Sequence, residues 1–283
     1  MESESTTITT SETFNYPNAD VIIRSSAPNK VDFRVHKFIL SLSSSFFETM
    51  FTLPDASQKA PKTNLPVVDV SEPANTIDLL LRTIYPSIPE PIFDTLNTLR
   101  PVLGAALKFK MQAAVVVLRR VLLKPAFLKV NPMKVYALAA SYDFEDEAKV
   151  ASQYTLNLEL STQPLMEDMK TMSAYYYHRL MMMHRRRREA ARTLIQTFPP
   201  LTPVKSRDGQ RPPPPKCTCW DFWNSWKARA EMELIHKPTS NVIFTHDFCY
   251  QNSRPDSCSR YNCPNLKILD NLKNSIDAIV FTI

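Results

Sequence analysis

Glycine is nearly absent from this sequence, which has only Gly104 and Gly209 among its 283 residues. A phosphate-binding loop needs closely spaced glycines, because its backbone must turn tightly and approach the phosphates without a Cβ in the way. The nucleophile elbow of serine hydrolases also needs two nearby glycines. The sequence therefore excludes the dinucleotide-binding fingerprint, the P-loop and the nucleophile elbow.

Cysteine is absent from the first 216 residues, and all five cysteines lie in the last quarter of the chain. Zinc takes four Cys or His ligands, usually offered as two close pairs. The candidate zinc ligands are Cys217, Cys219, Cys258 and Cys263, with His246 and Cys249 as a further pair between them. Because none of these pairs has the usual Cys-x-x-Cys spacing, we favour the alternative of small buried thiols beside Trp220, Trp223 and Trp226. We therefore predict no metal site and no cofactor.

Long apolar runs are also missing. No stretch approaches the roughly 18 apolar residues of a membrane span, and the first ten residues have no apolar signal region. Residues 1–17 are polar apart from Phe14 and Tyr16, so we expect a disordered tail there. These observations predict an intracellular protein, cytoplasmic or nuclear, with no membrane partner.

Positive charge is in modest excess, with a net charge of +6 and a pI near 9.0. The run from His184 to Arg188 permits a nuclear-import or RNA-binding interpretation. The alternative is a solvated helix face, because Arg185, Arg188 and Arg192 project the same way at helical spacing. No base-stacking aromatic motif accompanies the run, so we favour the solvated face and do not predict nucleic-acid binding.

The most informative stretch is residues 31–51. Phe33 and Val35 share one face of a period-two strand, after which the apolar residues change abruptly to helical spacing. Ser45 stands three residues before Glu48, a spacing that predicts a capped start of a second helix. The sequence therefore predicts a half-buried strand followed by two short helices.

This stretch, together with Asp20, resembles the BTB/POZ domain. Later residues, among them 65–70, 79–81 and 135–137, resemble a fungal family of BTB proteins with a helical C-terminal half. The motif residues that carry the resemblance are Asp20, Phe33, His36, Lys37, Phe46, Phe47, Met50 and Phe51. The resemblance implies an α+β core, with a short three-stranded sheet flanked by helices, followed by a mostly α-helical region. It also implies that Asp20 and His36 help to hold this core, which favours a structural His36 over a catalytic or metal-binding one.

Composition shifts divide the rest of the chain. We expect a tail over 1–17, a BTB/POZ domain over 18–124 and a helical extension over 125–200. A proline-rich linker over 201–216 then leads to a small helical unit over 217–283 that contains the cysteines and tryptophans.

No hydroxyl or thiol nucleophile stands at a useful spacing from a base, and no paired carboxylates suggest acid–base chemistry. We therefore predict a non-enzymatic protein–protein interaction module that takes no small-molecule substrate. The resemblance implies an adaptor or scaffold whose partner is another BTB protein or a cullin ubiquitin ligase. The nearest match to the apolar-x-Glu element of cullin adaptors is Leu53-Pro54-Asp55, so Leu53 and Asp55 are the candidate partner-binding residues.

The alternative function is a BTB scaffold in nuclear or transcriptional regulation. BTB regulators of that kind exchange an extra strand and helix before the Asp20 position. Since residues 1–17 lack such an element, we expect the BTB core to be a monomer or a weak dimer.

Overall fold

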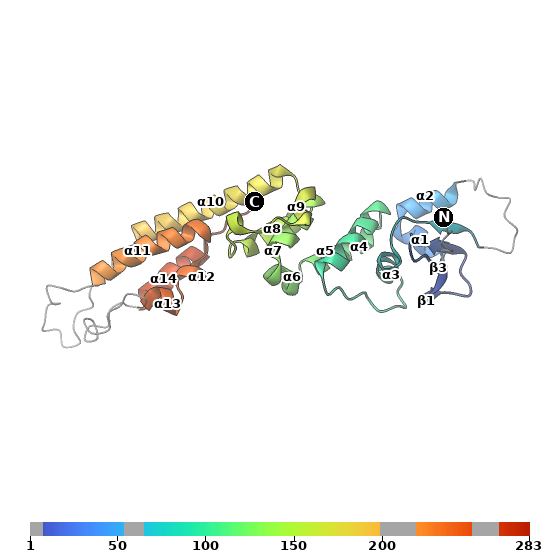
Figure 1. Cartoon of the computed structure of the whole chain (residues 1–283), viewed down its shortest axis with the longest axis horizontal. Helices are drawn as coiled ribbons and strands as arrows, with labels where there is room; N and C mark the ends of the chain where they lie inside the picture. The colour runs from blue at the N-terminus through green and yellow to red at the C-terminus, as the bar shows by residue number, and fades with distance from the viewer. Residues whose placement is uncertain (1–7, 54–64, 199–218, 251–265) are drawn as a thin grey trace, which may run out of the picture. The chain divides into compact units, whose positions relative to one another are not determined.

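The computed structural model of this chain describes residues 8–53, 65–198, 219–250 and 266–283 (Figure 1). The chain divides into two compact units, Met1–Leu128 and Lys129–Ile283, each considered by itself. The boundary falls within the short helix α6 (Pro125–Val130). The first unit contains a four-stranded sheet with helices, and the described part of the second is mostly helical, so the predicted α+β class is confirmed.

The sheet of the first unit has the strand order β1-β3-β2-β4. Its strands are β1 (Thr9–Asn15), β2 (Val21–Arg24), β3 (Val31–Val35) and β4 (Val67–Asp69). The central β2 and β3 form an antiparallel hairpin, with Val21 opposite Val35. Arg24 and Asp32 face each other across this hairpin, and their side chains form an ion pair at 2.6 Å. The two outer strands are each parallel to their neighbour, β1 to β3 and β4 to β2.

The strand β1 corrects three expectations. The disordered tail over 1–17 is wrong for Thr9–Asn15, and the sheet has four strands instead of three. A strand also precedes the Asp20 position, so the expected absence of one is wrong. Phe14 is fully buried, with its ring centroid 6.1 Å from that of Phe33 and 5.3 Å from that of Tyr85. Burial of this one aromatic side chain and backbone pairing to β3 stabilise β1, although most residues around Phe14 are polar.

In the described part of the first unit, five helices lie between the sheet strands and α6 or between the strands themselves. They are α1 (Lys37–Ser43), α2 (Ser45–Thr52), α3 (Ala74–Arg82), α4 (Leu96–Lys108) and α5 (Gln112–Leu122). The N-cap of α2 is Ser44, not the predicted Ser45, because the Ser44 hydroxyl accepts the Phe47 N–H at 3.1 Å. The same hydroxyl donates to the Phe109 carbonyl, so one serine both caps α2 and ties it to the end of α4.

The second unit is a helical array. Its larger helices are α7 (Pro132–Ser141), α8 (Glu145–Thr155), α10 (Ala174–Thr197), α11 (Cys219–His236) and α14 (Leu266–Asp277). Its short helices are η1 (Leu160–Thr162), α9 (Glu167–Thr171), α12 (Ser240–Ile243) and α13 (His246–Tyr250). No helix within the described ranges is both long and apolar enough to span a bilayer.

One apolar cluster joins the later helices of the second unit. Ala191 and Ile195 of α10 pack with Trp223 and Trp226 of α11 and with Leu272 of α14. The helices α10 and α11 lie side by side in Figure 1. The described part of the predicted 217–283 unit therefore shares its core with α10 and does not have a separate one.

Candidate interaction surface

The start of α1 is held by polar contacts from two motif residues. The Asp20 carboxylate accepts the Lys37 N–H at 2.7 Å, which satisfies one of the amides that a helix N-terminus leaves free. The His36 N–H donates to the Tyr85 hydroxyl at 2.9 Å, and the His36 ring lies 5.0 Å from that of Tyr16. Burial raises the pKa of Tyr85 to about 12, so its hydroxyl stays neutral as the acceptor. These contacts favour the structural interpretation of Asp20 and His36.

The aromatic residues of α2 divide between core and surface. Phe47 is 2% exposed, and its ring centroid lies 5.2 Å from that of Phe109. Phe51 and Met50 are half-buried, and the Lys37 ammonium lies 5.5 Å from the centre of the Phe51 ring. Phe46, next to Phe47, is 39% exposed. Of the aromatic motif residues, Phe47 and the strand residue Phe33 are therefore the two that are buried in the interior of the unit.

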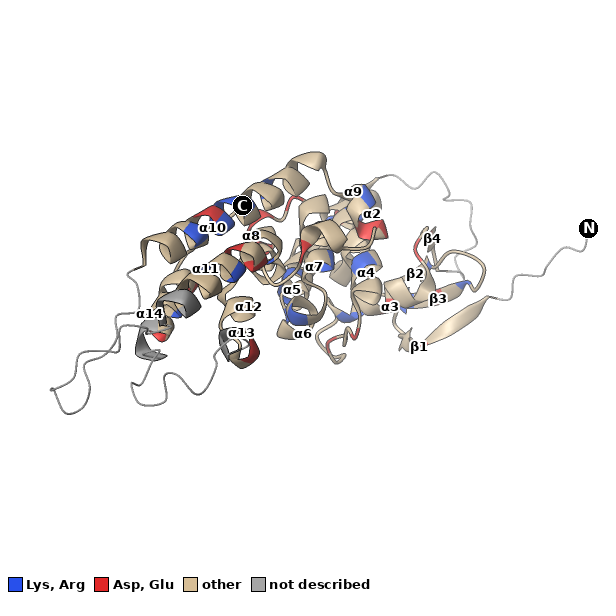
Figure 2. Ribbon diagram, turned by 60° about the vertical axis from the view of Figure 1, so that its left-hand side comes forward, with Lys and Arg blue, Asp and Glu red and all other residues tan. Residues whose placement is uncertain are grey.

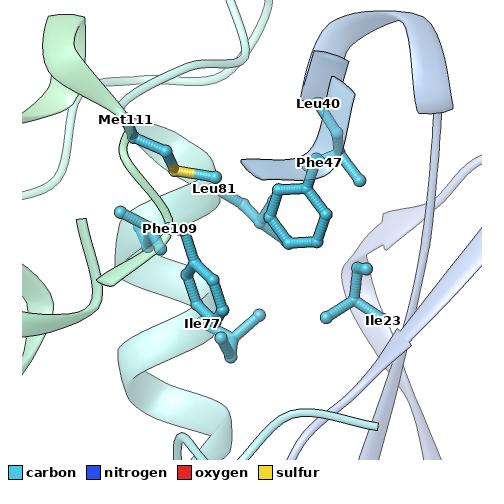
Figure 3. A pocket seen from close by; sticks show the side chains of 8 residues that line it. Ile23, Leu40, Phe47, Ile77, Leu81, Phe109 and Met111 are labelled. Atoms are coloured by element: carbon cyan, nitrogen blue, oxygen red, sulfur yellow. The ribbon is translucent and has the colours of Figure 1, made fainter. Parts of the chain in front are cut away.

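Phe47 borders a small void in the apolar core (Figure 3). The void measures about 10 Å³ and is lined only by apolar side chains, among them Ile23, Leu40 and Met111. A buried water needs at least that much room and several polar partners, so this void stays dry and holds no ligand. It is a gap in the packing and not a binding site.

The exposed side of α1 presents two large apolar side chains. Phe38 is 75% exposed and Leu42 is 77% exposed, whereas Leu40 between them is fully buried. Because residues four apart lie one turn above each other, Phe38 and Leu42 form one continuous ridge, here named the α1 face. Exposed apolar patches on folded proteins mark binding sites for other proteins or membranes. The α1 face is therefore the best candidate interaction surface of the first unit.

The predicted partner-binding residues lie just after α2. Leu53 directly follows this helix and is 62% exposed, which leaves its side chain available for contact. Asp55 lies outside the described residues.

The basic run of α10 is not a uniformly charged face, because two of its members are buried. The His184 Nε2 lies 2.9 Å from the Thr155 hydroxyl, and burial lowers the pKa of His184 to about 4, so the ring is neutral at pH 7. The Arg187 guanidinium is 6% exposed and donates to the carbonyl of Ile276 at 3.2 Å, to that of Pro238 at 2.9 Å and to that of Ile279. These two residues are therefore buried polar groups of the core whose hydrogen bonds are satisfied, and they do not belong to a solvated face.

The exposed arginines of α10 are partly neutralised. Arg185 pairs with Glu189 at 2.8 Å, and Arg192 pairs with Glu231 of α11 at 3.2 Å. Figure 2 shows acidic as well as basic positions along α10. This mixture of charges fits the solvated-face interpretation better than a nucleic-acid interface, which would need a continuous basic surface.

The candidate zinc ligands cannot be placed: Cys217, Cys258 and Cys263 lie outside the described residues, and of Cys219 only the helical backbone is described. Within the described ranges, no three His, Cys, Asp or Glu side chains are close enough to hold a metal. The Trp223 and Trp226 rings are buried and stacked, with centroids 5.1 Å apart.

We expect a chelator to leave the tryptophan fluorescence of the protein unchanged. The two stacked indoles are held by apolar side chains of α10, α12 and α14, so their burial does not require a metal. Fluorescence before and after EDTA treatment, with elemental analysis of the purified protein, tests this expectation. Near-stoichiometric zinc together with a loss of the tryptophan signal would contradict it.

Comparison with known proteins identifies the first unit. The family model of the BTB/POZ domain matches residues 12–125, which include all four strands except the start of β1, and helices α1 to α5. No curated protein matches the chain. BTB/POZ domains bind other proteins, as the exposed α1 face also suggests. Residues 12–125 of this chain are therefore a BTB/POZ domain, a protein–protein interaction module.

Proposed function

We propose that this protein is a non-enzymatic adaptor or scaffold, in which the BTB/POZ unit binds one protein and the helical second unit holds another. The observation that carries the proposal is the α1 face, where Phe38 and Leu42 are each about three-quarters exposed. Leaving two large apolar side chains in water has a free-energy cost, which binding of a complementary protein surface removes.

The specific partner that we propose for the BTB/POZ unit is a cullin ubiquitin ligase. Support comes from the resemblance to cullin adaptors and from the exposed Leu53 at the end of α2. The tripeptide Leu53-Pro54-Asp55 departs from the apolar-x-Glu element in its last residue, although aspartate keeps the negative charge. A nuclear regulatory complex is the alternative partner, and the net charge of +6 is the feature that favours it.

Placing glutamate at both positions of the α1 face should abolish recovery of the partner in a pull-down analysed by mass spectrometry. The Phe38→Glu/Leu42→Glu variant puts charges where the partner would bury apolar surface, and unpaired charges at an interface centre are strongly unfavourable. Both side chains are exposed, so we expect the free energy of unfolding to change by less than about 1 kcal/mol.

The matched control is Ile92→Glu, because Ile92 lies in the same unit and is 79% exposed. This variant should recover the partner as the unaltered protein does. A cullin in the recovered complex supports the ubiquitin-ligase adaptor, and a chromatin complex supports the nuclear scaffold. Equal recovery by the α1-face variant and the control would contradict the proposed role of the α1 face.

A further inference from the structure

A hollow of about 340 Å³ lies beside the N-terminal half of α10 in the second unit. Its lining residues are His178, Arg179, Met182, Met183 and Arg186 from α10, with Thr282 and Ile283 opposite them. The hollow is therefore a basic rim around an apolar floor of methionine and isoleucine. Its size suits one or two side chains of a bound peptide.

The wall formed by the segment after α14 is fixed in place. The Gln153 side-chain amide of α8 donates to the Phe281 carbonyl at 2.6 Å, and the buried Arg187 guanidinium donates to the Ile279 carbonyl. Figures 1 and 2 both show this end of the chain beside α10. The hollow is therefore preformed, so a ligand would not have to order this wall on binding.

One of the two arginines at the rim forms no ion pair with a carboxylate side chain of the described residues. Arg179 is paired with Glu145 at 2.9 Å, and Arg185 outside the hollow is paired with Glu189. Arg186 is exposed, and among the described residues it has neither an ion pair nor a hydrogen bond. None of the side chains that line the hollow is acidic. A free guanidinium at the rim selects an anionic ligand group and can bind a carboxylate through two parallel hydrogen bonds.

We propose that this hollow binds an acidic peptide segment of a partner protein. A carboxylate of the peptide pairs with Arg186, with His178 as a second donor at the rim, and an adjacent apolar side chain packs on Met182 and Met183. Methionine side chains adapt to different apolar shapes, as is needed for a floor that accepts Leu, Ile or Phe. This inference rests on the proposed function, because it gives the second unit the site with which it holds a protein.

Selection of a random twelve-residue peptide library on the full-length protein tests the proposal. The enriched peptides should carry Asp or Glu next to an apolar residue. The strongest binder, labelled with fluorescein and measured by anisotropy, should bind the Arg186→Gln variant at least about tenfold more weakly, because a charge-assisted pair is lost. Replacing the peptide's carboxylates by amides should weaken binding to the unaltered protein to the same degree.

The matched control is Arg188→Gln, which removes the same charge from the same helix but does not line the hollow. It should change the affinity by less than about twofold, since screening weakens the influence of a more distant charge. Enrichment of no peptide, enrichment of peptides without acidic residues, or equal losses for Arg186→Gln and Arg188→Gln would overturn the proposal.

The peptide selection and the pull-down with the α1-face variant test different claims, so either one can fail while the other succeeds. If the α1-face variant loses its partner while no acidic peptide binds the hollow, the inference is wrong and the proposed function stands. If an acidic peptide binds through Arg186 while the α1-face variant keeps its partner, the hollow is a binding site and the proposed role of the α1 face is wrong.

Discussion

Replacing Phe47 with alanine should lower the free energy of unfolding of the BTB/POZ unit by about 3–5 kcal/mol, the range for truncating a buried phenylalanine. The Phe47 ring packs against those of Phe109 and Phe51 and closes the small apolar void of the core, so its removal enlarges a cavity that stays dry. Hydrogen–deuterium exchange of peptides from β2 and β3, as a function of urea, measures this loss within the unit.

Phe46→Ala is the matched control, because it makes the same chemical change at the next residue of α2. Phe46 is 39% exposed, compared with 2% for Phe47, so we expect a loss of about 1 kcal/mol or less. Similar losses for the two variants would mean that the two rings are buried to the same extent, which would contradict the packing of α2.

The central part of the BTB/POZ unit is predictable from the sequence because its patterns are local. The change from period two to helical spacing after Val35 correctly predicts the end of β3 and the start of α1. The N-cap of α2 lies one residue before the predicted position. A local pattern cannot separate Ser43, Ser44 and Ser45, because they are chemically equivalent. Only the contact of Ser44 with the distant Phe109 carbonyl distinguishes them, and a local pattern does not contain that contact.

The strand β1 could not be predicted because it lacks the alternation on which strand prediction depends. Its buried residues, Ser11 and Phe14, are three apart, and its register with β3 shifts between Thr10 and Asn15. Such an irregular strand leaves no period-two signal in the sequence. Phe14, one of two aromatic residues in this polar segment, was the feature of the sequence that indicated burial of part of the segment.

The candidate interaction surface was predictable only in part. The spacing of Phe38 and Leu42 is visible in the sequence, but α1 also carries Ile39 and Leu40, so its apolar residues do not all lie on one face. Which side faces the core is decided by packing, and the full burial of Leu40 resolves it. The burial of Arg187 in the basic run of α10 was easier to predict. Arg187 stands at helical spacing between Leu180 and Ala191, two buried apolar residues.

Arg187→Met should lower the free energy of unfolding of the second unit by about 3 kcal/mol, because it leaves buried carbonyls without their charged donor. Methionine nearly matches the volume of the arginine stem but cannot donate to the carbonyls of Pro238, Ile276 and Ile279. All three tryptophans belong to this unit, so urea unfolding followed by tryptophan fluorescence reports on it directly.

Arg185→Met removes the same charge two residues earlier on α10 and serves as the control. Arg185 is largely exposed and has a surface ion pair with Glu189, a type of pair that contributes about 0–1 kcal/mol. Its loss should therefore shift the unfolding midpoint only slightly. If Arg187→Met proved as mild as Arg185→Met, Arg187 would not hold the end of α14 against α10, and the wall of the hollow that contains Arg186 would have to be held by Gln153 and apolar contacts alone.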